Sequence, residues 1–220
     1  MKLDVQLVKQ EKGSVDCGLA CLSMILSYYG IDESIEKIKD KFKVYKGGTY
    51  SGQLAKYLIE KGFAVSVTTL NPAMFTLQDT EMSQEEILLR LKHLLEIEKR
   101  ASNRTTLRHF IAFMQSGGEF EVKIPEINDV REEIDRKQPM IVQLTSQFFK
   151  AKKPKLMYHF NVVSGYNKEH VFVSDPLPDK RGGDNKYLAR DFFYGVYSAI
   201  AADMDNGCFI KIKRKGPNGH

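Results

Sequence analysis

Among the three cysteines of the chain, Cys17 lies where a thiol is most readily activated. From Leu19 on, apolar residues recur at helical spacing, at Leu19, Leu22, Met24, Ile25, Leu26 and Tyr29. This pattern predicts a buried helix that Asp16 caps and Gly30 ends, with Cys17 as its first residue. A helix N-terminus stabilises negative charge, so it favours a thiolate over a thiol. Cys17 is therefore a candidate nucleophile.

A free cysteine is more often a small buried core residue, so this assignment needs a partner that takes the thiol proton. Cys21, one turn later, fits the core interpretation better, and so does Cys208 at the start of a predicted strand. The partner is expected on a β-hairpin formed by residues 159–166 and 171–175, joined by a four-residue loop. Closing this hairpin brings the start of its first strand beside the end of its second, which makes His159 and Asp175 neighbours.

A histidine held by a carboxylate is the arrangement that activates a nucleophilic thiol. The imidazole takes the thiol proton, and the carboxylate fixes the imidazole tautomer and supports its positive charge. His159 follows Cys17 by 142 positions, within the separation of about 130–150 typical of papain-like enzymes. Gln10, seven residues before Cys17, is the candidate to stabilise an oxyanion together with the Cys17 backbone N–H. Asp175 precedes Pro176, so a plain turn-forming role is the alternative for it.

The other histidines are interpreted as solvated surface residues. They are His93 on an exposed helix face, His109 at a helix start, His170 in the hairpin loop and His220 at the terminus.

Several further elements are expected to position these residues. They are a turn with Asp32 as cap opening a helix to about Phe42, a glycine-bearing loop 45–52, a helix over 54–61 capped by Ser51, a strand over 63–70, a strand over 119–125, a helix over 128–137, a strand over 140–144, a helix over 190–202 and a strand over 208–213. Residues 73–118 differ in character. A capping box of Ser83 and Glu86 begins a helix that runs to about Arg100, and a second helix from Thr105 or Thr106 stops at Gly117. We interpret 73–118 as a helical insertion within one domain.

Composition limits the function classes. The chain has 220 residues, 42% hydrophobic residues and a formal charge of +5, with a mean hydropathy of -0.35, as expected for an ordinary globular protein. No run approaches the roughly 18 apolar residues of a membrane span, and the first residues do not resemble a signal peptide. Three cysteines without a C-x-x-C pair argue against disulfides and a metal site and for a cytoplasmic location. The basic stretches 150–155 and 211–215 lack the interleaved aromatics of a nucleic-acid site.

The stretch from Gln10 to Gly30, with the motif Asp16-Cys17-Gly18-Leu19-Ala20-Cys21 followed by MILSYYG, resembles the N-terminal motif of the C39 and C39-like peptidases. These are papain-fold cysteine peptidases of bacteria and archaea. The stretch HFNVVSGYNKEHVFVSDP resembles the histidine and aspartate motif of that family. The resemblance covers most of the chain outside 73–118. It implies Cys17 as nucleophile, His159 as general base and acid, Asp175 as the residue that orients His159, and Gln10 as oxyanion donor.

Two features depart from the family pattern. Gln10 lies one residue farther from the cysteine than usual, which a loop through Gly13 and Ser14 would absorb. The best-known members are fused to transporter membrane and nucleotide-binding domains and cut peptides after a double glycine. The present sequence has no such domains and no G-x-x-x-x-G-K-[ST] loop. The transporter substrate is therefore not carried over.

The sequence thus predicts an α+β, papain-like fold in one domain over 1–220, with a helical lobe, an antiparallel β-sheet lobe and the site between them. The expected function is that of a cysteine peptidase or amidase that cleaves a peptide-like amide through a Cys17 thioester, without cofactor or metal. An acyltransferase using the same Cys-His-Asp site and a catalytically idle peptide-binding module are the alternatives. The 73–118 insertion is expected to flank the cleft and is a possible docking site for a protein partner.

Overall fold

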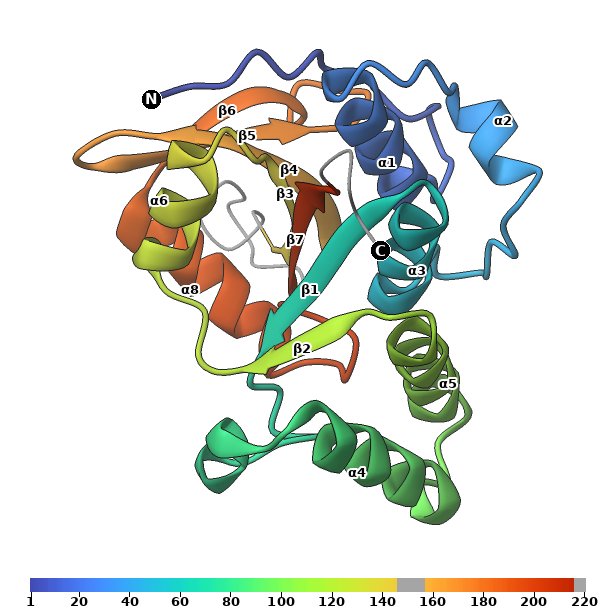
Figure 1. The fold of residues 1–220 in the computed structure, drawn as a ribbon. Coiled ribbons are helices and arrows are strands. Elements are labelled where there is room, and N and C mark those ends of the chain that lie inside the picture. Colours follow the sequence, from blue (N-terminus) through green and yellow to red (C-terminus); the bar gives the residue numbers. More distant parts are fainter. Residues whose placement is uncertain (146–156, 216–220) are drawn as a thin grey trace.

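A mixed sheet forms the centre of the molecule in the computed structural model, which describes residues 1–145 and 157–215. Seven strands follow the order β2-β1-β7-β3-β4-β5-β6 (Figure 1). They are β1 (Phe63–Thr69), β2 (Glu119–Val122), β3 (Met140–Leu144), β4 (His159–Tyr166), β5 (His170–Asp175), β6 (Gly183–Leu188) and β7 (Phe209–Arg214). Neighbouring strands are antiparallel except for the parallel pair of β1 and β2. The α+β class is confirmed, and this one pair departs from the antiparallel sheet that the sequence predicted.

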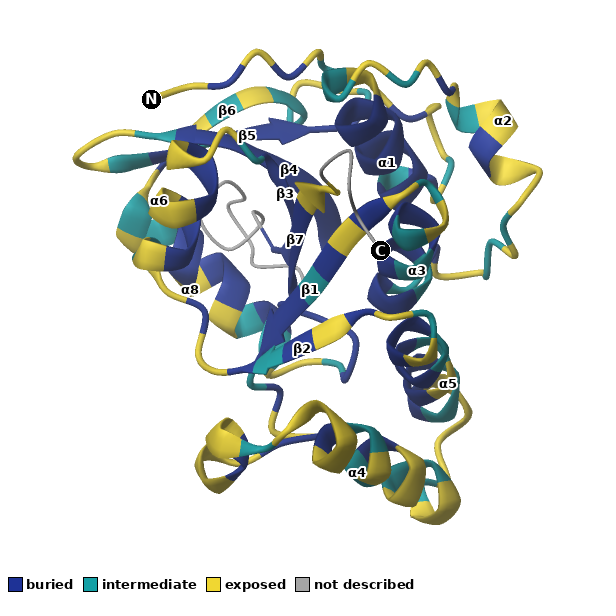
Figure 2. Ribbon diagram, in the orientation of Figure 1, coloured by how far each residue is buried: buried dark blue, intermediate teal, exposed yellow. Residues whose placement is uncertain are grey.

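Helices cover both faces of the sheet. On one face lie α1 (Cys17–Tyr28) and α3 (Ser51–Glu60), and on the other lie α6 (Ile127–Asp135) and α8 (Ala189–Ile200) (Figure 1). Ring contacts fix the layers, because Tyr29 after α1 packs on Phe63 of β1 while Phe192 of α8 packs on Phe209 of β7. Short elements at the periphery are α2 (Ile35–Lys39) and the 3-10 helix η1 (Leu77–Glu81). The sheet is therefore buried on both sides, and α1 is almost entirely dark in Figure 2.

The 73–118 segment contains two helices, α4 (Gln84–Ile97) and α5 (Ala101–Gln115). The capping box of Ser83 and Glu86 is present as the sequence predicted, and α4 buries only Ile87 and Leu91, so most of it is exposed (Figure 2). The start of α5 differs from the prediction, because it lies at Ala101 and not at Thr105 or Thr106. Glu98 explains the earlier start, since its carboxylate accepts the backbone N–H groups of Lys99 and Arg100 and so satisfies free donors ahead of the helix.

Three predicted helix caps are wrong in detail. Asp16 occupies the N-cap position of α1 but makes no capping hydrogen bond, because its carboxylate pairs with Lys39 at 2.8 Å. Ser34, not Asp32, caps α2, with its hydroxyl accepting the Lys37 N–H. Ser51 does not precede α3 but is its first residue, and its N–H and hydroxyl both donate to the buried Asp205. In two of the three cases a tertiary partner has replaced a local one.

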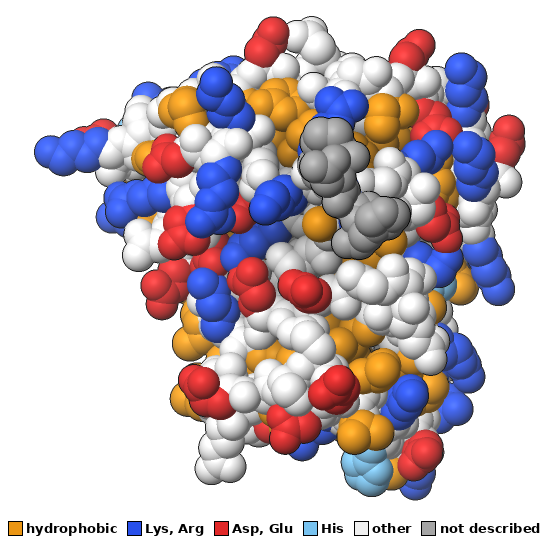
Figure 3. Space-filling view, in the orientation of Figure 1, with side chains coloured by type: hydrophobic (Ala, Val, Ile, Leu, Met, Phe, Trp, Pro, Cys, Tyr) orange, Lys and Arg blue, Asp and Glu red, His pale blue; other side chains and the backbone are white. Residues whose placement is uncertain are grey.

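Two sequence features lie outside the described residues, namely the basic stretch Lys150–Lys155 and His220. On the face drawn in Figure 3, basic and acidic side chains are mixed and do not form one basic surface. Among the helices of the described ranges, none is long and apolar enough to cross a membrane.

Candidate active site

The first ten residues bring the start of α1 to the end of the β4–β5 hairpin. Met1 and Leu3 pair with the C-terminal end of β4. The Tyr166 N–H donates to Met1 O at 2.9 Å, and the Leu3 N–H donates to Ser164 O at 2.7 Å. The Gln10 N–H then donates to the Pro176 carbonyl at 2.8 Å. Because Pro176 directly follows Asp175, this bond fixes the chain just ahead of α1 to the end of β5.

Cys17 and His159 meet across this junction. Cys17 is the partly exposed first residue of α1, and its thiol is hydrogen-bonded to the side chain of His159, the first residue of β4. The Nε2 atom of His159 is hydrogen-bonded to Asp175 Oδ1 at 2.8 Å. This leaves Nδ1 as the ring nitrogen that faces the Cys17 sulfur. The backbone N–H groups of Phe160 and Gly18 also donate to the Cys17 sulfur. Three hydrogen-bonding groups thus surround the Cys17 thiol, and all three favour the thiolate.

The electrostatics of the pair follow from this geometry. Burial by itself would raise the pKa of the Cys17 thiol, but the charge of His159 and the three hydrogen bonds outweigh it, and the pKa is lowered. Burial likewise opposes charge on His159, yet the Cys17 thiolate and Asp175 together raise its pKa to about 9. Both shifts act in the direction of a thiolate beside an imidazolium.

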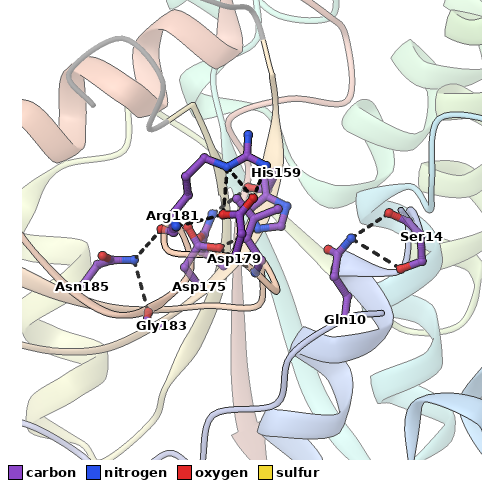
Figure 4. A network of polar contacts seen from close by, with 10 residues as sticks. Gln10, Ser14, His159, Asp175, Asp179, Arg181, Gly183 and Asn185 are labelled. Atoms are coloured by element: carbon purple, nitrogen blue, oxygen red, sulfur yellow. Dashed lines mark hydrogen bonds and ion pairs between the residues drawn. The ribbon is translucent and has the colours of Figure 1, made fainter. Parts of the chain in front are cut away.

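Asp175 is fully buried at the end of β5. Its Oδ1 accepts from His159 Nε2 at 2.8 Å and from the Leu177 N–H at 3.0 Å, whereas Oδ2 has no hydrogen-bond partner. The Leu177 bond belongs to the turn that the sequence offered as the alternative role of Asp175, and the His159 bond exists beside it. Figure 4 shows the ion pair of Asp179 and Arg181 close to His159 and Asp175, on the loop that follows β5.

The side chain of Gln10 is turned toward its own loop. Its Nε2 donates to the Ser14 carbonyl at 2.7 Å and lies 3.4 Å from the Ser14 hydroxyl (Figure 4). Its Oε1 is buried without a hydrogen-bond partner. The loop includes Gly13 at a φ of 84°, a left-handed conformation that suits glycine. In this conformation the amide donors serve Ser14, so the oxyanion role of Gln10 stays a prediction.

The other cysteines, and His109, lie outside the candidate site. Cys21 and Cys208 are buried, and burial raises the pKa of each thiol well above its usual range. The prediction for His109 is wrong, because it lies in the middle of α5 and its Nε2 is 3.1 Å from the Tyr45 hydroxyl. Burial lowers the pKa of His109. Where the structure describes the chain, no group of three or more His, Cys, Asp or Glu residues could hold a metal.

Two participants escaped the sequence. The Phe160 N–H acts through the backbone, so no residue type could have signalled it. Asp205, buried and hydrogen-bonded to Ser51, lies between the predicted helix 190–202 and the predicted strand 208–213. Its carboxylate had no local partner that would have drawn attention to it.

Family models match the chain over nearly its whole length. The model of the Peptidase C39 family matches residues 4–93, and the model of the Peptidase C39-like family matches residues 100–203. This chain belongs to the C39 peptidase family. The two matched segments contain Cys17 on one side and both His159 and Asp175 on the other.

Solved C39 peptidase structures share the fold. The peptidase domain of Streptococcus ComA, a bifunctional ABC transporter involved in quorum sensing, is 16% identical with a TM-score of 0.55, over 96% of this chain and 99% of that one. A double glycine motif protease from an AMS/PCAT transporter, solved with its leader peptide, is 16% identical with a TM-score of 0.51, over 97% and 94%. A structure described as a C39-like peptidase from Bacillus anthracis is 15% identical with a TM-score of 0.53, over 98% and 100%. These neighbours show the papain-like fold. Among curated proteins, none matches the chain.

Proposed function

We propose that this protein is a cysteine peptidase or amidase that cleaves a peptide-like amide through a thioester on Cys17. The observation that carries the proposal is the hydrogen-bonded chain from the Cys17 thiol through His159 to Asp175. Membership of the C39 family supports peptidase-type chemistry. One structural neighbour was solved with a leader peptide, which supports a peptide as the substrate.

The first half of the reaction forms the thioester. The Cys17 thiolate attacks the amide carbonyl carbon, and the negative charge moves to the carbonyl oxygen. The Cys17 backbone N–H, at the unpaired start of α1, supplies one donor to that oxygen. Gln10 would supply a second, once its amide turns from Ser14. The C–N bond then breaks, and the His159 imidazolium gives its proton to the leaving amine.

The second half releases the acid. Neutral His159 takes a proton from water, and the resulting hydroxide attacks the thioester carbonyl. The C–S bond breaks, and the thiolate and imidazolium are regenerated. Asp175 keeps its hydrogen bond to His159 Nε2 and stabilises His159 in its charged form, which the raised His159 pKa of about 9 reflects.

The test is a cleavage screen on a proteome-derived peptide mixture in water enriched in oxygen-18. New termini are found by mass spectrometry for the wild type, Cys17→Ala and His159→Ala. The proposal expects cleavages that both variants lose, with one heavy oxygen in each new C-terminus. Products joined to an added amine, without heavy oxygen, would show the acyltransferase instead. Binding of peptides without any product would show the idle module.

A further inference from the structure

A cavity of about 270 Å³ is lined in part by residues that adjoin the proposed catalytic pair. One wall includes Tyr158, the residue before His159, and another includes Thr49. The Thr49 hydroxyl lies so close to Gly18 that a Cβ on Gly18 would come within 2.2 Å of its oxygen. Gly18 directly follows Cys17. The wall of the cavity therefore includes a neighbour of each catalytic candidate, and the cavity has room for much more than one water, whose share of liquid volume is about 30 Å³.

Buried polar groups without partners converge on this cavity. Four residues of its lining, Thr49, Gln143, Tyr158 and Asn206, each carry a buried atom with no hydrogen-bond partner among the described residues, namely Thr49 Oγ1, Gln143 Oε1, the Tyr158 hydroxyl and Asn206 Nδ2. Thr49, Gln143 and Asn206 are each more than nine-tenths buried. Because a buried polar atom left unpaired is destabilising, such atoms normally have hydrogen-bond partners. Four of them around one cavity indicate a polar ligand that completes their hydrogen bonds.

The charges around the cavity have one sign. Asp203 and Asp205 line it, and of its described lining residues none is a lysine, an arginine or a histidine. Gln143 Oε1 and the hydroxyls of Thr49 and Tyr158 add acceptors to these carboxylates. Burial raises the pKa of Asp205 to about 8 and its oxygens already accept from Ser51, so Asp203 is the carboxylate available to a ligand. The acceptor-rich lining suits a group that carries several N–H donors and a positive charge.

The 73–118 segment contributes a residue to the lining of this cavity. Ser102 at the start of α5 lines the cavity, and Tyr45 lines it with its hydroxyl 3.1 Å from Nε2 of His109 in α5. Rings of Tyr45, Tyr50 and His109 pack together. Helix α5 thus packs against the glycine-bearing loop that lines the cavity.

We infer that this cavity is the side-chain specificity pocket of the proposed peptidase and that it takes a basic side chain, lysine or arginine, of the substrate. The inference rests on the proposed function for the identity of the substrate as a peptide. It assigns charge recognition to Asp203 and hydrogen bonding to Gln143, Thr49 and Tyr158.

Peptidyl chloromethyl ketones, which alkylate a reactive thiol, test the pocket without needing turnover. The probes carry arginine or its uncharged isostere citrulline, and lysine or norleucine, at the first, second or third position from the ketone, with alanine elsewhere. The rate of Cys17 labelling is followed by intact-protein mass spectrometry. We expect the charged probe of each pair to label about tenfold faster at one position. Equal rates at all three positions would overturn the inference.

Asp203→Asn isolates the charge, because asparagine keeps the oxygen that accepts the Asp205 N–H at 3.2 Å. This variant is expected to reduce the preference for arginine over citrulline to less than about threefold. Glu96→Gln, an equal change of charge on the exposed face of α4, should leave it intact. A preference that survives Asp203→Asn unchanged contradicts the inference.

If no probe labels Cys17 faster than Cys21 or Cys208, the proposed function fails, and the pocket is then tested by binding alone. Fluorescence polarisation of labelled five-residue peptides with a central arginine or citrulline is measured on the Cys17→Ala protein. Tighter binding of the arginine peptide supports the basic pocket, and equal binding overturns it.

Discussion

His159 Nε2 lies 2.8 Å from Asp175 Oδ1, although the two residues are 16 positions apart and start and end different strands. The β4–β5 hairpin brings them together, and the bond from Gln10 N–H to Pro176 O fixes the chain before Cys17 to the same place. One corner of the sheet thus brings together Cys17, His159 and Asp175, the three residues of the proposed site.

Asp175→Asn should weaken catalysis and change its pH range. The pKa of His159 is raised to about 9, in part by Asp175, so the imidazolium that protonates the leaving amine persists up to about that pH. Loss of the carboxylate lowers this pKa, and the alkaline limb of the rate profile should move to lower pH. We expect kcat/KM near neutral pH to fall by roughly tenfold or more. Asp179→Asn, an exposed change on the adjacent loop, is the control, and an equal shift there would argue against a specific role for Asp175.

Lys39→Met should raise the pKa of Cys17. Asp16, directly before the nucleophile, is almost buried and is neutralised by Lys39 at 2.8 Å. Without Lys39, the uncompensated carboxylate disfavours a thiolate beside it. Lys39 is half exposed, so the effect should be small and should shrink in high salt. Alkylation rate against pH measures it, with Lys37→Met as the control on the same helix. A Cys17 pKa that is unchanged or lowered would show that this ion pair does not affect the site.

Gln10→Ala separates the two roles open to this residue. An oxyanion donor acts after the thiolate has attacked, so its loss should reduce kcat by about a hundredfold while the alkylation rate of Cys17 stays near that of the wild type. A residue that only holds the Ser14 loop would instead change alkylation and thermal stability together. Ser14→Ala, which keeps the carbonyl that accepts from Gln10, serves as the matched variant.

Gly52→Ala tests whether the helices of 73–118 are part of the fold. A Cβ on Gly52 would lie 2.7–2.8 Å from backbone atoms of His109 and Phe110 in α5. Backbone cannot move aside cheaply, so we expect a loss of about 1–3 kcal/mol in the free energy of unfolding. This outweighs the gain of about 1 kcal/mol in helix propensity. Gly47→Ala meets no atom within 4 Å and is the control for chemical denaturation. A Gly52→Ala protein as stable as the wild type would contradict the close packing of α3 on α5.

The sequence was most informative where local pattern and chemistry coincide. The helix at Cys17 and the hairpin 159–175 follow from apolar spacing and turn residues, and the fold class and family followed from the motifs on them. The helix start at Ala101 was missed because Glu98 provides a cap outside the recognised capping patterns. The caps at Asp16 and Ser51 were misread because Lys39 and Asp205, far along the chain, take their hydrogen bonds.

In the candidate site, too, local contacts were predictable from the sequence and contacts between distant elements were not. Hairpin closure sufficed to pair His159 with Asp175, since strand register is a local property. The contacts of Phe160 N–H with the thiol, of His109 with Tyr45 and of Asp205 with Ser51 depend on how separate elements pack. No spacing rule in the sequence encodes them.

The central claim is that His159 makes Cys17 a thiolate, and alkylation of each cysteine against pH tests it most directly. Iodoacetamide labelling is quantified by peptide mass spectrometry for the wild type and His159→Ala, with Cys21 and Cys208 as controls inside the same molecule. An ordinary thiol titrates near about 8.5. The account predicts that Cys17 reacts well below that pH, that the two buried cysteines do not, and that His159→Ala abolishes the difference. A Cys17 that titrates like an ordinary thiol in the wild type, or that is unaffected by the loss of His159, would contradict it.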